Sequence, residues 1–533
     1  MQEKYQVIIL GSGVAGTMLG AILARHKVKV LIIEKSSHPK FAIGESTIPY
    51  TTFTLAGISE LFDISELHPA NIRQKIVHTS GIKKNLSFAY HRPEQEQKKE
   101  EVTQSNSGVA ELHFFRQDLD TYLLNVAIQY GATVKQNCSI SDIEFSSDGK
   151  NVLITSQEGE EFLGSYIVDA IGYSSILAQK FNLRENPTHF KSYTRSLFTH
   201  MINVPYFETC VHPQKSHGMP VSFYEGTVHH LFDGGWIWII PFNNHKDSTN
   251  PLCSVGLQLD ARRFPKTNIP PEQEFLEILS KYPSISKQFN TAKAVRDWIS
   301  VPRLQYSSKK CIGDRYCLTP HSYGFVDPLF SRGLASNCGG VKYLATLILE
   351  AVRNNDFSKE HFKHLDQIYR KEIDLHDNLV YGAYIAFKDF ELWKCWQGVW
   401  TIAEFINFFQ IVITLTQLRK GNPNPFKELD IIGPGQELNA FVKKAVNEMQ
   451  QLDSGNSSTE IAIKNLKELL QQVDFFPEPL KFSFSRRFYK PSMLKLMEVA
   501  HWLKFKSNPQ VKTYYENFDP FKFNQMVKEM AKT

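Results

Sequence analysis

A glycine-rich loop near the N-terminus constrains the fold of this chain more than any other feature. It follows directly on an apolar run at residues 6–10, which predicts a buried parallel strand. The loop consists of Gly11, Ser12, Gly13, Val14, Ala15 and Gly16, and apolar residues recur at helical spacing after it. A second apolar run at 28–33 ends on Glu34, about twenty residues beyond the loop. This order of strand, loop, helix, strand and acid predicts a dinucleotide-binding fold.

Each part of the pattern has a physical role in binding a dinucleotide. Glycines allow a tight turn and let the backbone approach a pyrophosphate closely. The amides at a helix N-terminus donate hydrogen bonds to phosphate oxygens. Glu34 is suited to accept hydrogen bonds from a ribose hydroxyl. A further loop, Gly44-Glu45-Ser46, follows closely behind this acid, which is typical of flavoproteins and favours FAD over NAD.

Two more side chains are candidate contacts for FAD. Arg116 lies in a predicted helix start at 113–124, where it is placed to meet a phosphate or the flavin edge. Asp314 ends the apolar run 310–314, which we interpret as the last strand of the nucleotide fold, and it suits a ribityl hydroxyl. The sequence has no second glycine fingerprint, since Gly433-Pro434-Gly435 lacks the third glycine and a preceding strand. We therefore predict a single nucleotide site.

The pattern along the chain predicts an α/β protein with a helical C-terminal part. Its 533 residues are 42% hydrophobic, which is enough for a large core and for two or three domains. We predict a Rossmann-like FAD-binding domain of the aromatic-hydroxylase type at 1–350, with an antiparallel substrate sheet inserted at about 185–300. Amphipathic patterns predict helices over 351–533, which we expect to cover the substrate pocket.

Composition excludes some classes of function. The net charge of +5 is small and dispersed, which argues against nucleic acid as a partner. The seven cysteines are scattered without metal-ligand spacing, so we expect no structural metal and a reducing, cytoplasmic location. The chain begins with a predicted strand, and we see no leader segment. Its longest apolar run, 402–418, contains polar residues and predicts an amphipathic or buried helix, not a membrane span.

Two further segments combine aromatic residues with possible chemistry. Trp236 and Trp238 alternate in an apolar strand that ends at Pro241, which puts both rings on one face. Phe88 and Tyr90 alternate in a strand that Lys83 and Lys84 precede. A pair of tryptophans is usually part of a core, and a lysine pair usually lies at a solvated strand end. A segment at 327–333 precedes another predicted helix, whose N-terminal amides suit an anion.

These segments together resemble a flavin-dependent halogenase. The resemblance rests on the glycine loop and on the Trp-x-Trp-x-Ile-Pro pattern of residues 236–241, both without departure. Residues 44–49 and 327–331 resemble further segments of the family, and the resemblance covers about residues 5–350. The family's lysine opens a Lys-x-Gly-Ala-x-Phe-x-Trp strand. Lys83, which we favour over Lys84, holds that position here, although the final tryptophan is Tyr90.

The resemblance implies a reaction and a set of site residues. Reduced FAD, oxygen and chloride or bromide give hypohalous acid, and a lysine passes the halogen to an electron-rich aromatic ring. The implied roles are the lysine at Lys83, a halide site at the amides of Arg332 and Gly333, and a substrate pocket that includes Phe88, Tyr90 and Phe330. Trp236 and Trp238 would suppress direct hydroxylation of the substrate. No residue stands out as the substrate base, for which His91, His113 and Asp118 are candidates.

The departures from the family pattern indicate the class of substrate and partner. Phe330 stands where halogenases of free tryptophan carry a glutamate, which favours a phenol or pyrrole-like substrate, free or tethered to a carrier protein. The single nucleotide site implies a separate NAD(P)H-dependent flavin reductase. Two alternatives share the fold. They are a single-component FAD-dependent aromatic monooxygenase and a flavin-dependent reductase of isoprenoid double bonds.

Overall fold

The computed structural model describes residues 3–106, 108–109, 111–211, 217–422, 435–490 and 492–531. Gly433 and Pro434, which bear on the prediction of a single nucleotide site, lie outside these ranges. The chain forms two compact units, and each draws on three separate segments. Unit 1 comprises residues 1–76, 114–190 and 305–374, and unit 2 comprises residues 77–113, 191–304 and 375–533. The predicted division at residue 350 and the helical cover over the substrate pocket stay predictions.

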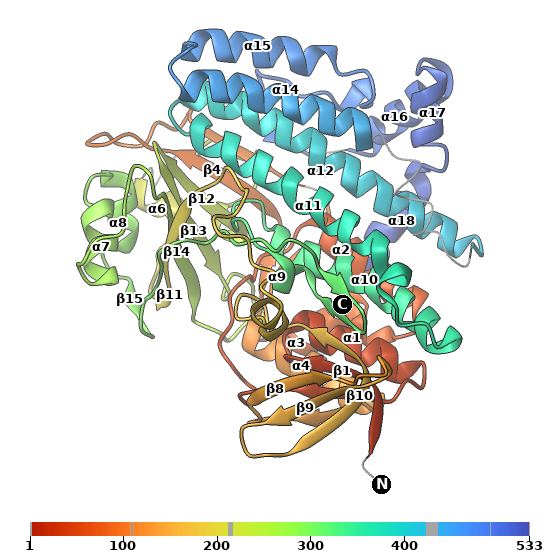
Figure 1. Ribbon diagram of the computed structural model, residues 1–533. Coiled ribbons are helices and arrows are strands. Elements are labelled where there is room, and N and C mark those ends of the chain that lie inside the picture. The colour runs from red at the N-terminus through yellow and green to blue at the C-terminus, as the bar shows by residue number, and fades with distance from the viewer. Residues whose placement is uncertain are drawn as a thin grey trace. The chain divides into compact units, whose positions relative to one another are not determined.

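Unit 1 is built on a mainly parallel sheet of apolar, buried strands (Figure 1). The strand order is β17-β18-β10-β1-β2-β7. In addition, β9 pairs with residues 161–164 of β10 and with β8. The five strands from β18 to β7 are parallel to one another. The bounds are β1 Lys4–Leu10, β2 Val30–Ile33, β7 Thr133–Lys135, β8 Ile140–Phe145, β9 Val152–Ser156, β10 Glu161–Asp169, β17 Ile312–Gly313 and β18 Tyr316–Leu318.

Helices follow the strands of unit 1, as expected for a parallel sheet, which needs crossover connections. Helix α1 packs against α4 and α10, and α10 packs against α2. The bounds are α1 Val14–Arg25, α2 Pro49–Leu61, α3 Pro69–Ile76, α4 Arg116–Gln129, α5 Ile176–Lys180, α9 Pro320–Tyr323 and α10 Arg332–Asn354. Helix α11, Lys359–Ala386, begins in unit 1 and ends in unit 2.

Unit 2 is built on a mainly antiparallel sheet of order β15-β11-β14-β13-β12-β4-β5-β19, with β16 paired to β11 (Figure 1). Its bounds are β4 Asn85–Tyr90, β5 Val102–Ser105, β11 Thr194–Ile202, β12 Gly226–Phe232, β13 Gly235–Pro241, β14 Cys253–Asp260, β15 Lys293–Ala294, β16 Ile299–Val301 and β19 Phe488–Tyr489. A separate ribbon pairs β3, Gly81–Lys83, with β6, Glu111–His113. The sheet therefore recruits strands from 85–105 and 488–489 in addition to the predicted segment.

Side-chain alternation gives the sheet of unit 2 two different faces. Ile237 and Ile239 point into an apolar core that includes Val255 and Leu257 of β14. That core packs on α7 and α8, through Phe275 and other residues. Trp236 and Trp238 alternate with these isoleucines, so their rings lie on the opposite face. The bounds of the helices on the core side are α6 Phe207–Val211, α7 Pro271–Leu279 and α8 Pro283–Phe289.

The C-terminal part of unit 2 is helical, as predicted (Figure 1). Its bounds are α12 Phe390–Arg419, α14 Gly435–Asp453, α15 Thr459–Gln472, α16 Met493–Phe505, α17 Pro509–Tyr514 and α18 Pro520–Ala531. Asp389 caps α12 by accepting hydrogen bonds from the amides of Glu391 and Leu392, at 2.9 and 3.1 Å. Among the described helices, α12 alone is long and apolar enough to cross a membrane, and 72% of its most apolar window is buried inside the protein.

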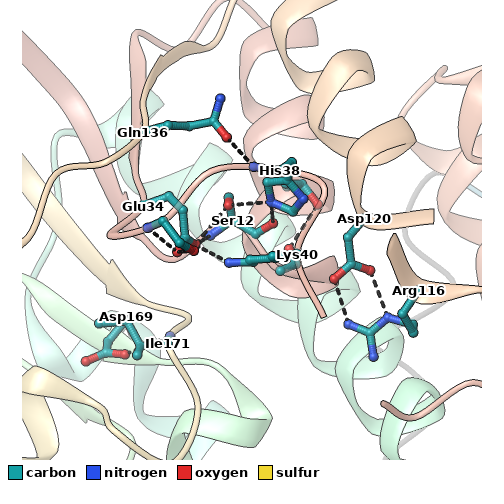
Figure 2. Close-up of polar contacts among 12 residues, drawn as sticks. Ser12, Glu34, His38, Lys40, Arg116, Asp120, Gln136, Asp169 and Ile171 are labelled. Carbon is teal, nitrogen blue, oxygen red and sulfur yellow. Dashed lines mark hydrogen bonds and ion pairs between the residues drawn. The ribbon is translucent and has the colours of Figure 1, made fainter. Parts of the chain in front are cut away.

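Asp169, at the carboxyl end of β10, connects three segments of unit 1. It is fully buried. One carboxylate oxygen accepts from the amide of Ile171 at 3.1 Å and from the hydroxyl of Ser322 at 3.2 Å. The other accepts from the hydroxyl of Ser175 at 2.7 Å and from the amide of Leu177 at 3.0 Å. These bonds fix the turn after β10 and the start of α5, and Figure 2 shows the carboxylate beside Ile171.

Replacing Asp169 by alanine tests this connection. Asp169→Ala leaves two backbone donors without their acceptor, so we expect it to lower the free energy of unfolding by about 3 kcal/mol. Asp169→Asn keeps one side-chain oxygen and should cost clearly less. Urea unfolding monitored by circular dichroism measures both variants. A loss below about 1 kcal/mol for the alanine variant would show that the connection is not structural.

Candidate functional site

The glycine loop of unit 1 has the close backbone packing that a dinucleotide site requires. Gly11 has a φ of +96°, and a Cβ there would lie 2.8 Å from the carbonyl oxygen of Ala170. A Cβ on Gly16 would overlap the carbonyl oxygen of Gly11, so α1 packs directly on the turn. No atom lies within 4 Å of a Cβ built on Gly13, the residue that precedes α1. The loop thus leaves open space at the start of α1, which fits the pyrophosphate of FAD.

Glu34 is buried beside this loop and keeps its charge (Figure 2). Burial alone would raise its pKa, but hydrogen bonds from Lys40, Ser12 and Ser36 outweigh it and hold the pKa at about 2. The amide and hydroxyl of Ser12 donate to one carboxylate oxygen at 3.0 and 2.9 Å, and Lys40 forms an ion pair with the same oxygen. The hydroxyl of Ser12 also lies 2.8 Å from the Nε2 atom of His38. Sequence reasoning missed Lys40 and His38, which have no motif of their own.

Arg116 holds the second predicted loop. Its guanidinium forms a two-bond ion pair with Asp120, with both distances 2.8 Å (Figure 2). The remaining Nη1 group donates to the carbonyl oxygens of Ile43 and Gly44. Gly44 has a φ of +92°, and the carbonyl of Glu45 accepts from the amide of Phe114 at 2.7 Å. The Arg116 side chain is therefore occupied in shaping the 43–45 loop. A direct contact of Arg116 or of this loop with FAD stays a prediction.

The prediction for Asp314 was wrong. The apolar run before it is not the last parallel strand but β17, a two-residue edge strand antiparallel to β18. Asp314 lies in the turn that leads into β18, whereas a nucleotide binds at the carboxyl ends of parallel strands. Its carboxylate instead accepts from the amide of Lys359 at 3.0 Å. The carboxyl end of β18 leads to Thr319 and α9. Asp314 precedes β18 and therefore lies at the amino ends of the parallel strands, away from the predicted nucleotide site.

The start of α10, where we predict the halide site, follows a tight turn. Ser331 precedes the helix in a left-handed conformation, with a φ of 53°. Asp327 is buried and accepts from the amide of Leu329 at 3.0 Å, which shapes the turn. Arg332 is buried, and its guanidinium reaches Glu372 at 3.4 Å. A Cβ on Gly333 would lie 3.3 Å from the imidazole of His321. Phe330 is fully buried in the same turn.

Lys83 of unit 2 is buried in a group of titratable side chains. It is 2% exposed and lies directly opposite Glu111 in the β3–β6 ribbon. Burial lowers the pKa of Lys83, and the charge of Glu111 opposes that shift. Burial likewise raises the pKa of Glu111 to about 8, against the attraction of Lys83. Lys84 is exposed by contrast and pairs with Glu225, so the structure separates the two lysines by environment.

The histidines near Lys83 are neutral. Burial, reinforced by the charge of Lys83, lowers the pKa of His113 and that of His229 to about 3. His113 contacts the carbonyl oxygen of Pro241 at 3.0 Å and the hydroxyl of Thr227 at 2.9 Å. His229 contacts the carbonyl oxygen of Ser87 at 3.2 Å through Nδ1. Sequence reasoning missed His229, because only strand pairing brings β12 beside β4.

The other two candidates for a substrate base lie elsewhere. His91 contacts His230 at 3.0 Å and the ring of Phe207, which belongs to the core under the sheet. Asp118 lies in the first turn of α4, in unit 1. Neither residue is therefore grouped with Lys83 inside unit 2.

Trp236 and Trp238 belong to a wall of buried rings. Their ring centroids lie 5.8 Å apart. The indole of Trp236 donates to the hydroxyl of Tyr384 at 3.0 Å, and that of Trp238 donates to the hydroxyl of Ser254 at 3.1 Å. A Cβ on Gly256 would overlap the ring of Trp238, so the glycine makes room for it. Both tryptophans therefore have fixed orientations.

Phe88 extends this wall. Its ring lies 4.9 Å from that of Trp393 and 4.8 Å from that of His229. The next aromatic residue of β4, Tyr90, donates its hydroxyl to the carbonyl oxygens of Phe387 and Lys388, at 3.0 and 2.9 Å. Tyr90 thus connects the strand to the turn between α11 and α12. Trp393 and Tyr384 come from the helical part of the chain, and sequence reasoning did not assign them to the site.

The described residues contain no group of three or more metal-ligating side chains. All seven cysteines are free. The residues that the structure brings together are therefore a glycine loop suited to a dinucleotide in unit 1, and a buried lysine beside a glutamate and two histidines in unit 2.

Comparison with known proteins identifies the family. A sequence model of a FAD binding domain matches residues 4–267. The halogenase PrnC of Pseudomonas fluorescens, which acts on monodechloroaminopyrrolnitrin, is 39% identical over 96% of this chain and 94% of its own length. The tetracycline 7-halogenase of Kitasatospora aureofaciens is 36% identical over the same shares of both chains.

A solved structure agrees with these relatives. The halogenase PltM, in complex with phloroglucinol and FAD, superposes with a TM-score of 0.88 and 33% identity over 91% of this chain and all of that one. Relatives this similar over nearly the whole length share the fold, the cofactor and the type of reaction. The chain therefore belongs to the family of flavin-dependent halogenases, enzymes that use FAD and a halide to halogenate aromatic compounds.

Proposed function

We propose that this enzyme halogenates a free phenol or pyrrole-like compound and that Lys83 carries the halogen to it. The observation behind the proposal is a buried lysine with a lowered pKa, directly opposite Glu111 in the β3–β6 ribbon and near His113 and His229. A neutral amine is a nucleophile, whereas an ammonium is not. A dry site also protects hypohalous acid from side reactions. The exposed Lys84 lacks both properties, which supports the choice of Lys83.

The class of substrate follows from the relatives and from Phe330. PrnC, the tetracycline halogenase and PltM match more than nine-tenths of this chain. The first two are named for aromatic compounds, and the PltM complex contains phloroglucinol. A chlorinase of pyrrole-2-carbonyl bound to a carrier protein matches only 70% of it, at 27% identity. An apolar Phe330 also differs from the glutamate of free-tryptophan halogenases. These points favour a free, electron-rich ring over a carrier-bound one.

We infer the residues that hold FAD and halide from the geometry of unit 1. The loop from Gly11 to Gly16 would bind the pyrophosphate, Glu34 a ribose hydroxyl, and the segment from Gly44 to Ser46 the flavin. The backbone amides of Arg332 and Gly333 would hold the halide. When bound, reduced FAD would supply the electrons that activate oxygen, and the activated oxygen would oxidise the halide to hypohalous acid. Arg116 would act indirectly, by fixing the 43–45 loop.

The chemistry of Lys83 then conserves atoms and charge. The lone pair of the Nζ atom attacks the halogen of hypohalous acid, so that an N–halogen bond forms as the O–halogen bond breaks. The departing hydroxide and one amine proton leave as water. The halogen is then transferred to the aromatic ring. Because the attack needs the neutral amine, the lowered pKa of Lys83 favours it.

Substitution of Lys83 tests the proposal. Lys83→Ala should lower aromatic halogenation at least about a thousandfold, since it removes the nucleophile. It should retain FAD binding and the formation of hypohalous acid, which monochlorodimedone traps. Product is measured by mass spectrometry with phloroglucinol, bromide and an external flavin reductase. Lys84→Ala is the matched control, because an exposed ion pair contributes little. Unchanged halogenation by the Lys83 variant would refute the assignment.

We also propose that Trp236 and Trp238 suppress direct hydroxylation of the substrate. Replacing both by alanine should raise the ratio of hydroxylated to halogenated product, and replacing both by phenylalanine should change it less. Gly256→Ala provides a milder test, because the new methyl group displaces the ring of Trp238 without opening a cavity. Chromatography gives the product ratio, and thermal melting gives stability. Lower stability of all these variants with an unchanged ratio would make the rings a structural core only.

We propose a separate NAD(P)H-dependent flavin reductase as partner, because the sequence has one glycine fingerprint. The purified chain with NADPH, FAD, oxygen and bromide should then yield no brominated phenol. Addition of an unrelated flavin reductase should restore product in proportion to the FAD reduced. Consumption of NADPH by the chain alone, coupled to product, would contradict the proposal.

A further inference from the structure

Glu111 is held opposite the lysine that we propose as halogen carrier. In the β3–β6 ribbon, Lys83 pairs with Glu111 and Gly81 pairs with His113. Directly opposite residues of an antiparallel pair point to the same face, with Cβ atoms about 5 Å apart. Glu111 is 6% exposed, and its Oε1 atom has no hydrogen-bond partner among the described residues. Burying a carboxyl oxygen without a hydrogen-bond partner costs free energy of folding, which indicates that this carboxyl group has a functional role.

Other titratable groups around the pair do not compete for its proton. His113 follows on β6, and His229 reaches the site from β12. Both are neutral, with pKa values lowered to about 3 by burial and by the charge of Lys83. His113 also has both ring nitrogens in hydrogen bonds. Among the described residues of unit 2, Glu111 is thus the group next to Lys83 that can gain and lose a proton near neutral pH.

We propose that Glu111 is the proton partner of Lys83: its carboxyl group protonates the amine nitrogen as the halogen leaves, and its carboxylate then takes the ring proton. This inference rests on the proposed role of Lys83. It assigns the substrate base that sequence reasoning left open.

The proposed halogen transfer balances in protons and electrons. The ring's π electrons attack the halogen of the N-halogenated Lys83, a carbon–halogen bond forms, and the N–halogen bond breaks. The electron pair of that bond stays on nitrogen, which takes the proton of Glu111 and becomes the neutral amine again. The carboxylate then removes the proton from the halogenated carbon, which restores the aromatic ring and the protonated Glu111. The sum is substrate plus hypohalous acid giving halogenated product plus water.

Burial prepares Glu111 for this cycle. Its pKa of about 8 keeps the carboxyl group protonated at neutral pH, so that it can donate as the halogen leaves. Above that pH the carboxyl group is ionised and cannot donate. We therefore expect the rate of halogen transfer to fall as the pH rises through about 8.

The variant Glu111→Gln tests the proposal, because it keeps the shape of the side chain and removes the titratable proton. We expect aromatic bromination to fall about 100-fold or more. The yield of hypobromous acid, trapped by monochlorodimedone, should stay at the wild-type level. The alkaline decline of the wild-type rate should be absent from the residual activity. Glu111→Asp, a carboxyl group on a shorter stem, should recover part of the rate.

Glu274→Gln is the matched control. Glu274 is also a buried glutamate of unit 2, but it forms a two-bond ion pair with Arg195, far along the chain from β3 and β6. Its substitution should lower stability and leave the pH profile of bromination unchanged. A readout independent of turnover is the infrared carboxylic acid band of the flavin-free protein. This band should titrate near pH 8 and should lose that component in Glu111→Gln but not in Glu274→Gln.

The outcomes separate this inference from the function on which it rests. Lys83→Ala with normal aromatic bromination would refute the role of Lys83. Lys83→Ala inactive, together with Glu111→Gln at the wild-type rate and with the wild-type pH profile, would refute the role of Glu111 alone. The absence of a carboxylic acid band titrating near pH 8 would likewise overturn it.

Discussion

The burial of a lysine and a glutamate side by side is the constraint on which unit 2 depends. Moving either charge alone out of water costs several kcal/mol, and their attraction offsets part of that cost. Burial therefore drives both groups toward their neutral forms, the amine of Lys83 and the acid of Glu111. In the mechanism that we propose, the same exclusion of water would preserve hypohalous acid. A single physical condition would thus serve the nucleophile, its proton partner and the oxidant.

In unit 1, the pKa of a buried glutamate is shifted in the opposite direction. Glu34 is 4% exposed, close to the 6% of Glu111, yet its pKa is about 2 and not about 8. The difference lies in the donors, since Ser12, Ser36 and Lys40 all donate to Glu34. A carboxylate saturated with donors stays charged and can fix a loop. A carboxyl group with an oxygen that lacks a donor, as in Glu111, can exchange a proton. Degree of burial alone therefore does not determine the role of a buried acid.

The sequence predicted what is local and missed what depends on strand pairing. The glycine loop, Glu34 and the tryptophan strand can each be recognised from a few consecutive residues. The fold class predicted from them is confirmed. Asp314 was misread because a strand of two residues and a reverse turn look like the end of one longer strand. Glu111 and His229 reach Lys83 only through the register of β6 and the pairing of β12 with β4. No local pattern marks such residues, so a single sequence cannot identify them.

The aromatic wall is fixed more firmly than a core requires. Phenylalanine could fill much of the volume at positions 236 and 238, but only an indole N–H can donate to Tyr384 and Ser254. These bonds restrict rotation of the rings, and the missing side chain of Gly256 leaves room for the ring of Trp238. A hydrophobic core requires side chains of about the right total volume and tolerates their rearrangement. In the role that we propose for them, the rings must also keep a fixed orientation, which two anchored tryptophans provide and two aliphatic residues would not.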